Sequence, residues 1–197
     1  IDVLDVADAE TAIGVDLGER VMYAVTPVDE DGTVHDVELK SGDEFRHHRE
    51  QITSKYDSLQ EQGKVRELRE LKNEREQYTD HMTHVASREI VNHARDQPDP
   101  VLVLEDLTGY RNRSRNAIHD WPFAELQTKI CYKATEAGIP VVTVDPAYTS
   151  QTCRKCDTTD SSSRDGVEFS CTNCGYQVHA DVNGAINIGL RGWDRKI

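Results

Sequence analysis

Two pairs of cysteines in this sequence are able to bind a metal ion. Cys153 and Cys156 form one pair, Cys171 and Cys174 form the other, and 14 residues separate the pairs. Each pair can form a tight knuckle, and four thiolates complete a closed tetrahedral shell for one structural zinc ion, with iron as the alternative. The segment between the pairs, DTTDSSSRDGVEFS, is polar and rich in turn residues. We therefore predict a zinc ribbon at residues 151–175.

Three acidic residues are candidates for one shared site, and the first, Asp16, lies in a strand where a carboxylate is costly to desolvate unless something compensates its charge. Asp16 lies in the alternating stretch TAIGVDLG, Glu105 lies in the apolar run VLVLEDL, and Asp181 begins the predicted last helix in HADVNGAINIG. Three carboxylates that converge in one cleft repel one another and need cations. Their oxygen atoms suit Mg²⁺ or Mn²⁺, and two such ions can promote phosphodiester cleavage. Taken singly, the acids can also be a turn residue, a solvated loop acid and a helix N-cap.

The predicted secondary structure places these acids in one α/β arrangement. Residues 11–40 read as three strands with short polar connections, which predicts an antiparallel meander. Residues 101–107 and 139–146 are apolar runs typical of strands buried on both faces. The segment 122–138 between them has helical periodicity, so the three elements predict a right-handed parallel crossover. A last helix is predicted at about residues 181–190.

A long, charged helical hairpin is expected at about residues 43–97. This segment contains almost no Gly or Pro, its apolar residues recur at steps of three, four and seven, and a break falls near Gly63. The resulting order of elements is that of the RNase H-like fold, a mixed five-stranded sheet with helices on both faces. In that fold the strands of Asp16 and Glu105 are neighbours, and the last helix brings Asp181 to the same place.

The composition favours some settings over others. The chain has 197 residues, with no apolar run long enough to span a membrane and no signal peptide at its start. We expect a cytoplasmic protein. The chain also opens without Met, which we interpret as a fragment or a processed form of a longer protein.

The charge of the chain has two opposite readings. Its net charge of −13, from 36 acidic and 23 basic residues, argues against nucleic-acid binding. Acid-rich, Lys-poor chains are, however, typical of salt-loving organisms, in which molar salt shortens the Debye length to about 3 Å and screens repulsion from phosphates. We expect a halophilic archaeal source, and we give local basic clusters more weight than the global charge.

One basic cluster follows Glu105 directly, in the segment YRNRSRN. It contains Arg111, Arg113 and Arg115. Arginines at this position suit contacts with nucleic-acid phosphates near the carboxylates. The alternative is a solvated loop that pairs with acidic neighbours.

Four segments, in order, closely resemble the C-terminal nuclease half of TnpB proteins. They are GVDLGERVMYAV, VLVLEDLTGY, WPFAELQTKICYKATEAGIPVVTVDPAYTSQTCRKC and CTNCGYQVHADVNGAINI, and the resemblance covers about residues 12–190. TnpB proteins, also known as OrfB-type transposases, are transposon-encoded, RNA-guided DNA endonucleases, similar to the RuvC-type domain of type V CRISPR effectors. The resemblance implies a RuvC/RNase H-like nuclease domain at residues 1–150 and 176–197, with the zinc ribbon inserted before the third acid.

The resemblance also implies residue roles and partners. The catalytic acids of the family fall on Asp16, Glu105 and Asp181, which hold magnesium, and its zinc ligands fall on the four cysteines. A DNA substrate and a guide RNA are implied, the guide being held by an N-terminal half that is absent here. Many relatives carry Gly after the second cysteine of the first knuckle, where this chain has Asp157.

Two other functions are open at the level of sequence. Actin-like ATPases share a DLG on the first strand, but Glu19 and Arg20 follow it here instead of small hydroxyl residues, and no second phosphate loop is recognised. A non-catalytic, guided nucleic-acid-binding or regulatory module is the other alternative. The presence of all three acids favours the nuclease over a binding-only role.

Overall fold

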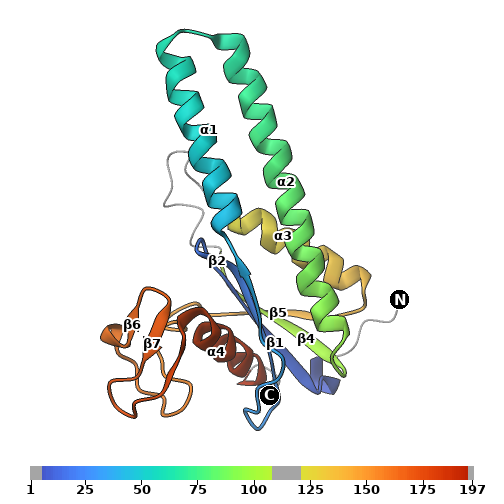
Figure 1. Cartoon of the computed structure of the whole chain (residues 1–197). Coiled ribbons are helices and arrows are strands. Elements are labelled where there is room, and N and C mark those ends of the chain that lie inside the picture. Colours follow the sequence, from blue (N-terminus) through green and yellow to red (C-terminus); the bar gives the residue numbers. More distant parts are fainter. Residues whose placement is uncertain (1–5, 108–120, 195–197) are drawn as a thin grey trace.

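The structure, a computed structural model, describes residues 6–107 and 121–194 (Figure 1). Its centre is a five-stranded sheet composed of β1 (Thr11–Leu17), β2 (Val21–Val28), β3 (Glu38–Ser41), β4 (Pro100–Glu105) and β5 (Val141–Val144). The strand order is β3-β2-β1-β4-β5. β1 pairs antiparallel with β2 and parallel with β4, and β4 pairs parallel with β5. The predicted mixed five-stranded sheet is confirmed.

The two faces of the sheet carry different layers. Side chains alternate along a strand, so Ile13 and Val15 of β1 enter one core together with α2 (Val65–Arg95) and α3 (Phe123–Glu136). Ala12 belongs to the opposite face, which α4 (Ala180–Asp194) covers. The sheet is therefore buried between helices on both faces, as Figure 1 shows.

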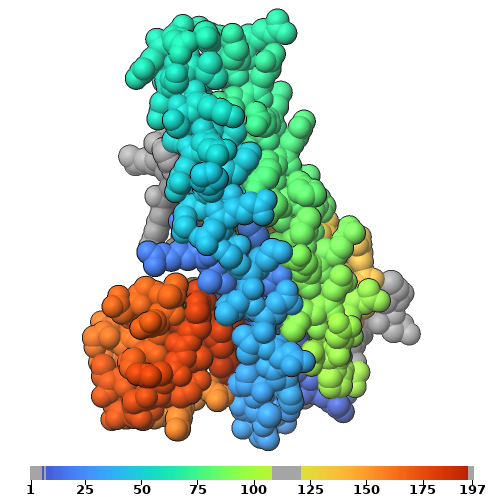
Figure 2. Space-filling view, in the orientation of Figure 1, coloured from blue at the N-terminus to red at the C-terminus, as the bar shows by residue number. Residues whose placement is uncertain are grey.

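The predicted helical hairpin is present and stands out from the body of the molecule (Figures 1 and 2). Its first arm is α1 (Asp43–Glu61), its second arm is α2, and the chain turns between them at Gly63, which has φ +67°. Only Phe45 and Ile52 are buried in α1. The hairpin therefore has the narrow apolar stripe that its sequence indicates.

A second, smaller sheet precedes α4. It contains β6 (Arg164–Asp165), β7 (Glu168–Ser170) and β8 (Gln177–His179), paired antiparallel in that order. β8 runs directly into α4, so the small sheet lies beside the N-terminal end of that helix (Figure 1).

The third strand is shorter than predicted, since β3 begins at Glu38 and residues 33–37 make only the isolated bridge between Val34 and Val28. Pro27 of β2 explains the difference. Its carbonyl accepts a bond from His35 on this side of the strand, but proline has no N–H to donate in return, so the ladder cannot continue.

The last helix is longer than predicted, running from Ala180 to Asp194. Its residues from Ala180 to Gly189 are all buried, because it crosses the face of the central sheet. Among the described residues, none of the helices combines the length and the apolar character of a membrane span.

Candidate active site and metal centre

Asp16 lies near the end of β1, on the face of the sheet that α4 covers. Gly184 of α4 lies directly over it, and a Cβ atom added there would collide with the Asp16 carboxylate. Burial is the largest cause that raises the pKa of Asp16 to about 8, and repulsion from Glu105 and Asp181 adds to it. The fold thus holds Asp16 where its negative charge is unfavourable without a cation.

Glu105 ends β4 beside Asp16. Val15 and Leu104 are partners in the parallel ladder, so one further residue along each strand brings Asp16 next to Glu105. The Thr149 hydroxyl donates a hydrogen bond of 2.6 Å to Glu105 Oε1, which orients this carboxylate. Burial raises the pKa of Glu105, and the bond from Thr149 opposes that shift.

Asp181 lies in the first turn of α4, and its side chain is 12% exposed. Its Oδ1 accepts a hydrogen bond of 2.7 Å from Arg164 Nη2. On its other side, His179 Nδ1 lies 3.9 Å from Oδ2. Asp181 therefore already has one cationic partner, which the small sheet supplies.

Arg164 is a site residue that sequence reasoning missed. It lies in the polar segment between the cysteine pairs, where no periodicity or motif distinguishes it from its neighbours. It reaches Asp181 only because β6 and β7 fold back beside the start of α4. Its charge also lowers the pKa of Asp16, against the three causes that raise it.

The structure thus brings the three predicted acids to one face of the sheet, from β1, β4 and α4. They interact electrostatically but do not form a compact cluster. Among residues 6–107 and 121–194, only the four cysteines bring three or more possible metal-ligand atoms within 4.8 Å of one another. Desolvated carboxylate oxygens of like charge are nevertheless the donor set that hard divalent cations prefer.

Glycine allows α4 to lie close to β1. A Cβ atom at Gly14 would overlap the backbone oxygen of Ala185, and one at Gly189 would lie 3.3 Å from the Gly14 nitrogen. The absence of side chains at both positions lets the helix approach the middle strand directly. This contact determines how close α4, which carries Asp181, lies to β1, which carries Asp16.

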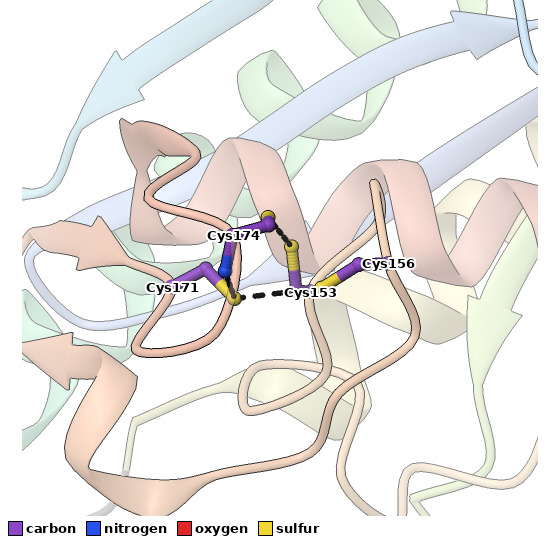
Figure 3. Close-up of side chains that lie close together, drawn as sticks. All are labelled: Cys153, Cys156, Cys171 and Cys174. Carbon is purple, nitrogen blue, oxygen red and sulfur yellow. Dashed lines mark hydrogen bonds between the residues drawn. The ribbon is translucent and has the colours of Figure 1, made fainter.

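The four cysteines are close together and are all free thiols (Figure 3). The Sγ atoms of Cys153 and Cys174 are 3.7 Å apart, and those of Cys156 and Cys171 are 3.6 Å apart. Cys153 and Cys171 are buried, whereas Cys174 is exposed. The group fits a tetrahedral zinc ion, which would leave no open position for water or substrate.

The two cysteine pairs have the same backbone geometry. In each pair the residue after the second cysteine donates its N–H to the carbonyl of the first cysteine, from Asp157 at 2.9 Å and from Gly175 at 3.0 Å. Both residues have positive φ, 57° for Asp157 and 69° for Gly175. Asp157 therefore adopts the left-handed conformation that favours glycine, and the turn is kept.

The thiols differ in their ease of ionisation. Burial raises the pKa of Cys153 to about 12, whereas hydrogen bonds with Thr158 lower the pKa of Cys156 to about 6. Zinc binding requires thiolates, so loading the site releases protons. Of these two thiols, Cys156 is therefore the one that ionises more readily.

The basic cluster predicted from the sequence, Arg111, Arg113 and Arg115, lies outside the described residues. Its role remains a prediction.

Comparison with known proteins relates this chain to CRISPR-associated endodeoxyribonucleases and to TnpB-like proteins. Residues 123–188 match the domain family described as "Cas12f1-like, TNB domain". The CRISPR-associated endodeoxyribonuclease Cas12f1 of Sulfoacidibacillus thermotolerans is 34% identical over 98% of this chain and 48% of the relative. A TnpB-like protein of Aquifex aeolicus (strain VF5) is 32% identical over 51% of this chain and 37% of the relative. The chain thus spans about half the length of the Cas12f1 relative.

A solved structure has the same fold. The cryo-EM structure of a Cas12f1–sgRNA–target DNA complex superimposes with a TM-score of 0.74 and 22% identity, covering 96% of this chain and 51% of that one. The sheet, its flanking helices and the small sheet before the last helix therefore form a Cas12f-like fold.

Proposed function

Because this chain is a homologue of the Cas12f1 and TnpB-like proteins, as its sequence predicted, we propose that it is the DNA-cleaving part of an RNA-guided endonuclease. Residues 1–150 and 176–197 form the nuclease domain in this proposal, and residues 151–175 form the zinc ribbon. Its partners are a DNA substrate and, in the full-length protein, a guide RNA. The observation that carries the proposal is the approach of three acids from three distant elements, with the pKa of Asp16 raised to about 8.

The carboxylates of Asp16, Glu105 and Asp181 are the proposed ligands for the catalytic cations. Two Mg²⁺ or Mn²⁺ ions held there would activate a water molecule and stabilise the leaving oxygen of the phosphodiester. The protein contributes preorganisation. Thr149 orients Glu105, and the α4–β1 contact fixes the position of Asp181.

Arg164 has a proposed role as a counter-charge. Its guanidinium lies 2.7 Å from Asp181 and balances the charge of that carboxylate, and Arg164 itself lies in β6, beside the start of α4. Once cations neutralise the carboxylates, the same planar fork is suited to a phosphate oxygen. The ribbon therefore takes part in the site through this one side chain.

Zinc has a structural role in this proposal, with one ion per chain. The first cysteine pair is joined to α4 by Asn183, whose side chain bonds the Thr152 carbonyl at 2.8 Å, and by Asn187, which bonds the same carbonyl at 2.7 Å. A folded ribbon therefore supports the start of the helix that carries Asp181.

The test is cleavage by the full-length protein with its guide and Mg²⁺. Asp16→Asn keeps the size of the side chain but removes a charged ligand, so we expect cleavage to fall on the order of 100-fold or more. Asp194→Asn, which removes an exposed carboxylate at the far end of α4, is the matched control and is expected to cleave normally. Wild-type rates in Asp16→Asn, or target binding without cleavage in the wild type, would instead assign a binding-only module.

A further inference from the structure

A groove of about 600 Å³ lies between α2 and α3, on the face of the sheet opposite α4. It is separate from the three acids and from the cysteines. Its charged and aromatic lining comprises His84, Arg88, Arg95, Tyr132, Lys133 and Glu136. We call it the α2–α3 groove.

The groove is basic, although the chain as a whole has a net charge of −13. Three basic side chains, Arg88, Arg95 and Lys133, line the groove together with one acid, Glu136. Arg88 and Arg95 are exposed, and neither forms an ion pair with another described residue. Elsewhere on the same helix, Arg66 is paired with Glu70 and Lys72 with Glu76.

Lys133 is held in place by neutral partners. Its ammonium group donates to the His84 carbonyl at 2.7 Å and to Ser87 Oγ at 2.6 Å. Burial lowers the pKa of Lys133, and repulsion from Arg88 and Lys129 lowers it further. These contacts fix the charge without neutralising it, so the groove has a positive potential that attracts anions.

Tyr132 adds an aromatic surface beside these charges. Tyr132 is 40% exposed, and Lys133 Nζ lies 5.9 Å from the centroid of its ring. Arginine guanidinium groups bind the phosphates of a nucleic-acid backbone, and an exposed aromatic ring beside them can stack on a base. An acidic peptide would use the charges but gain little from the ring.

We propose that the α2–α3 groove binds the phosphodiester backbone of a single-stranded nucleic-acid segment, at a site separate from the cleavage site. This inference adds to the proposed nuclease function and rests on it for the presence of nucleic acid. Since the groove and the acids lie on opposite faces of the sheet, the segment in the groove is not the stretch of strand being cut. The site holds and orients nucleic acid rather than acting on it.

The test compares two double variants on the same helix of the full-length protein. Arg88→Gln with Arg95→Gln removes the unpaired charges of the groove, and Arg66→Gln with Arg69→Gln removes the same charge from the exposed start of α2. The probes are fluorescein-labelled single-stranded RNA and DNA of mixed sequence, measured by fluorescence anisotropy over a salt series. We expect the groove variant to bind about 10-fold more weakly, with a salt slope shallower by about one per arginine, and the control to change less than about twofold.

Several outcomes overturn the proposal. If both double variants lose the same affinity for the probes, the effect is one of general charge. If polyglutamate displaces the probes as strongly as unlabelled nucleic acid does, the groove is a site for acidic peptides. Tyr132→Ala keeps every charge, so we expect it to weaken nucleic-acid binding without changing the salt slope. If this variant binds as tightly as the wild type, Tyr132 does not stack on a base. The relative losses for RNA and DNA identify which of the two occupies the groove.

The two proposals fail separately. If Asp16→Asn abolishes cleavage while the groove variant binds normally, the groove inference is wrong and the nuclease remains. If the groove variant loses binding while Asp16→Asn cleaves normally, the active-site assignment is wrong and the groove remains.

Discussion

The two candidate metal sites of this molecule are built in opposite ways. The four cysteines lie within 4.8 Å of one another and come from two neighbouring knuckles with the same backbone geometry. The three acids come from β1, β4 and α4, are spread more widely, and include a carboxylate whose pKa is raised to about 8. The cysteine site is assembled locally, whereas the acidic site depends on the whole sheet.

The two sites are therefore expected to affect stability in opposite ways: the cysteine site stabilises the fold when metal is bound, and the acidic site weakens it when metal is absent. Metal binding to the cysteines adds directly to the free energy of folding of a ribbon with little core. Asp16 and Glu105 instead carry charges that burial makes unfavourable, a cost in stability that natural proteins accept at active sites. The following predictions test this contrast.

The largest effect is expected from losing the zinc site. Cys171→Ser removes a buried thiolate ligand, so zinc content falls from about one ion per chain toward none and the ribbon loses stability, by an amount on the order of several kcal/mol. Elemental analysis and hydrogen exchange of residues 151–175 measure the two effects. Cys131→Ser, outside the cluster, is the control and should keep its zinc. An ordered ribbon without metal, or a disulfide between the knuckles, contradicts the prediction.

A smaller effect of opposite sign is expected at the acidic site. Asp16→Asn should make the metal-free protein more stable at pH 8, by at least ~1 kcal/mol, because it removes an unfavourably buried charge. Thermal unfolding in a chelator measures it, with Asp194→Asn as control. A loss of stability at pH 8 would show that the Asp16 carboxylate is already well compensated.

The pH dependence of that gain has a definite sign. The pKa of Asp16 rises from 3.8 to about 8 on folding, so between these values the unfolded chain binds fewer protons than the folded one. The stability of the wild type therefore falls as pH rises through this window, by at most about 1.4 kcal/mol per pH unit from this group. The advantage of Asp16→Asn should be small near pH 4 and largest above pH 8.

The smallest effect is expected at the first knuckle. Asp157 has φ 57°, so Asp157→Gly relieves local strain at some cost in chain entropy, for a net gain on the order of 0.5 kcal/mol. Asp157→Val should destabilise the ribbon, because a β-branched residue fits this conformation poorly. Thermal unfolding of the zinc-loaded protein ranks the three side chains. A stability order other than Gly, Asp, Val would mean that the aspartate side chain itself supports the turn.

Sequence reasoning succeeded where a signal is local. The spacing of the cysteines predicted their cluster, and the apolar patterns predicted β1, β4, both arms of the hairpin and the break at Gly63. Matching the element order to a known fold was enough to bring Asp16, Glu105 and Asp181 together. The resemblance to TnpB-type proteins was confirmed by the relatives found.

The rest depends on contacts that no local pattern carries. Arg164 meets Asp181 only after the ribbon folds beside α4, and the truncation of β3 depends on which side of β2 the nitrogen of Pro27 faces. The α2–α3 groove was not foreseen, because its cations lie on two helices whose neighbourhood only the tertiary structure defines. The conformation of Asp157 was recognisable only as a departure from its relatives.

The contact between β1 and α4 has a consequence for biosynthesis. Among the described elements, α4 is the last that a ribosome releases, yet it covers Val101 and Val103 and provides Asp181. Until it emerges, a nascent chain exposes that apolar face and has only two of the three acids. The proposed cleavage site therefore cannot be complete until α4 has left the ribosome.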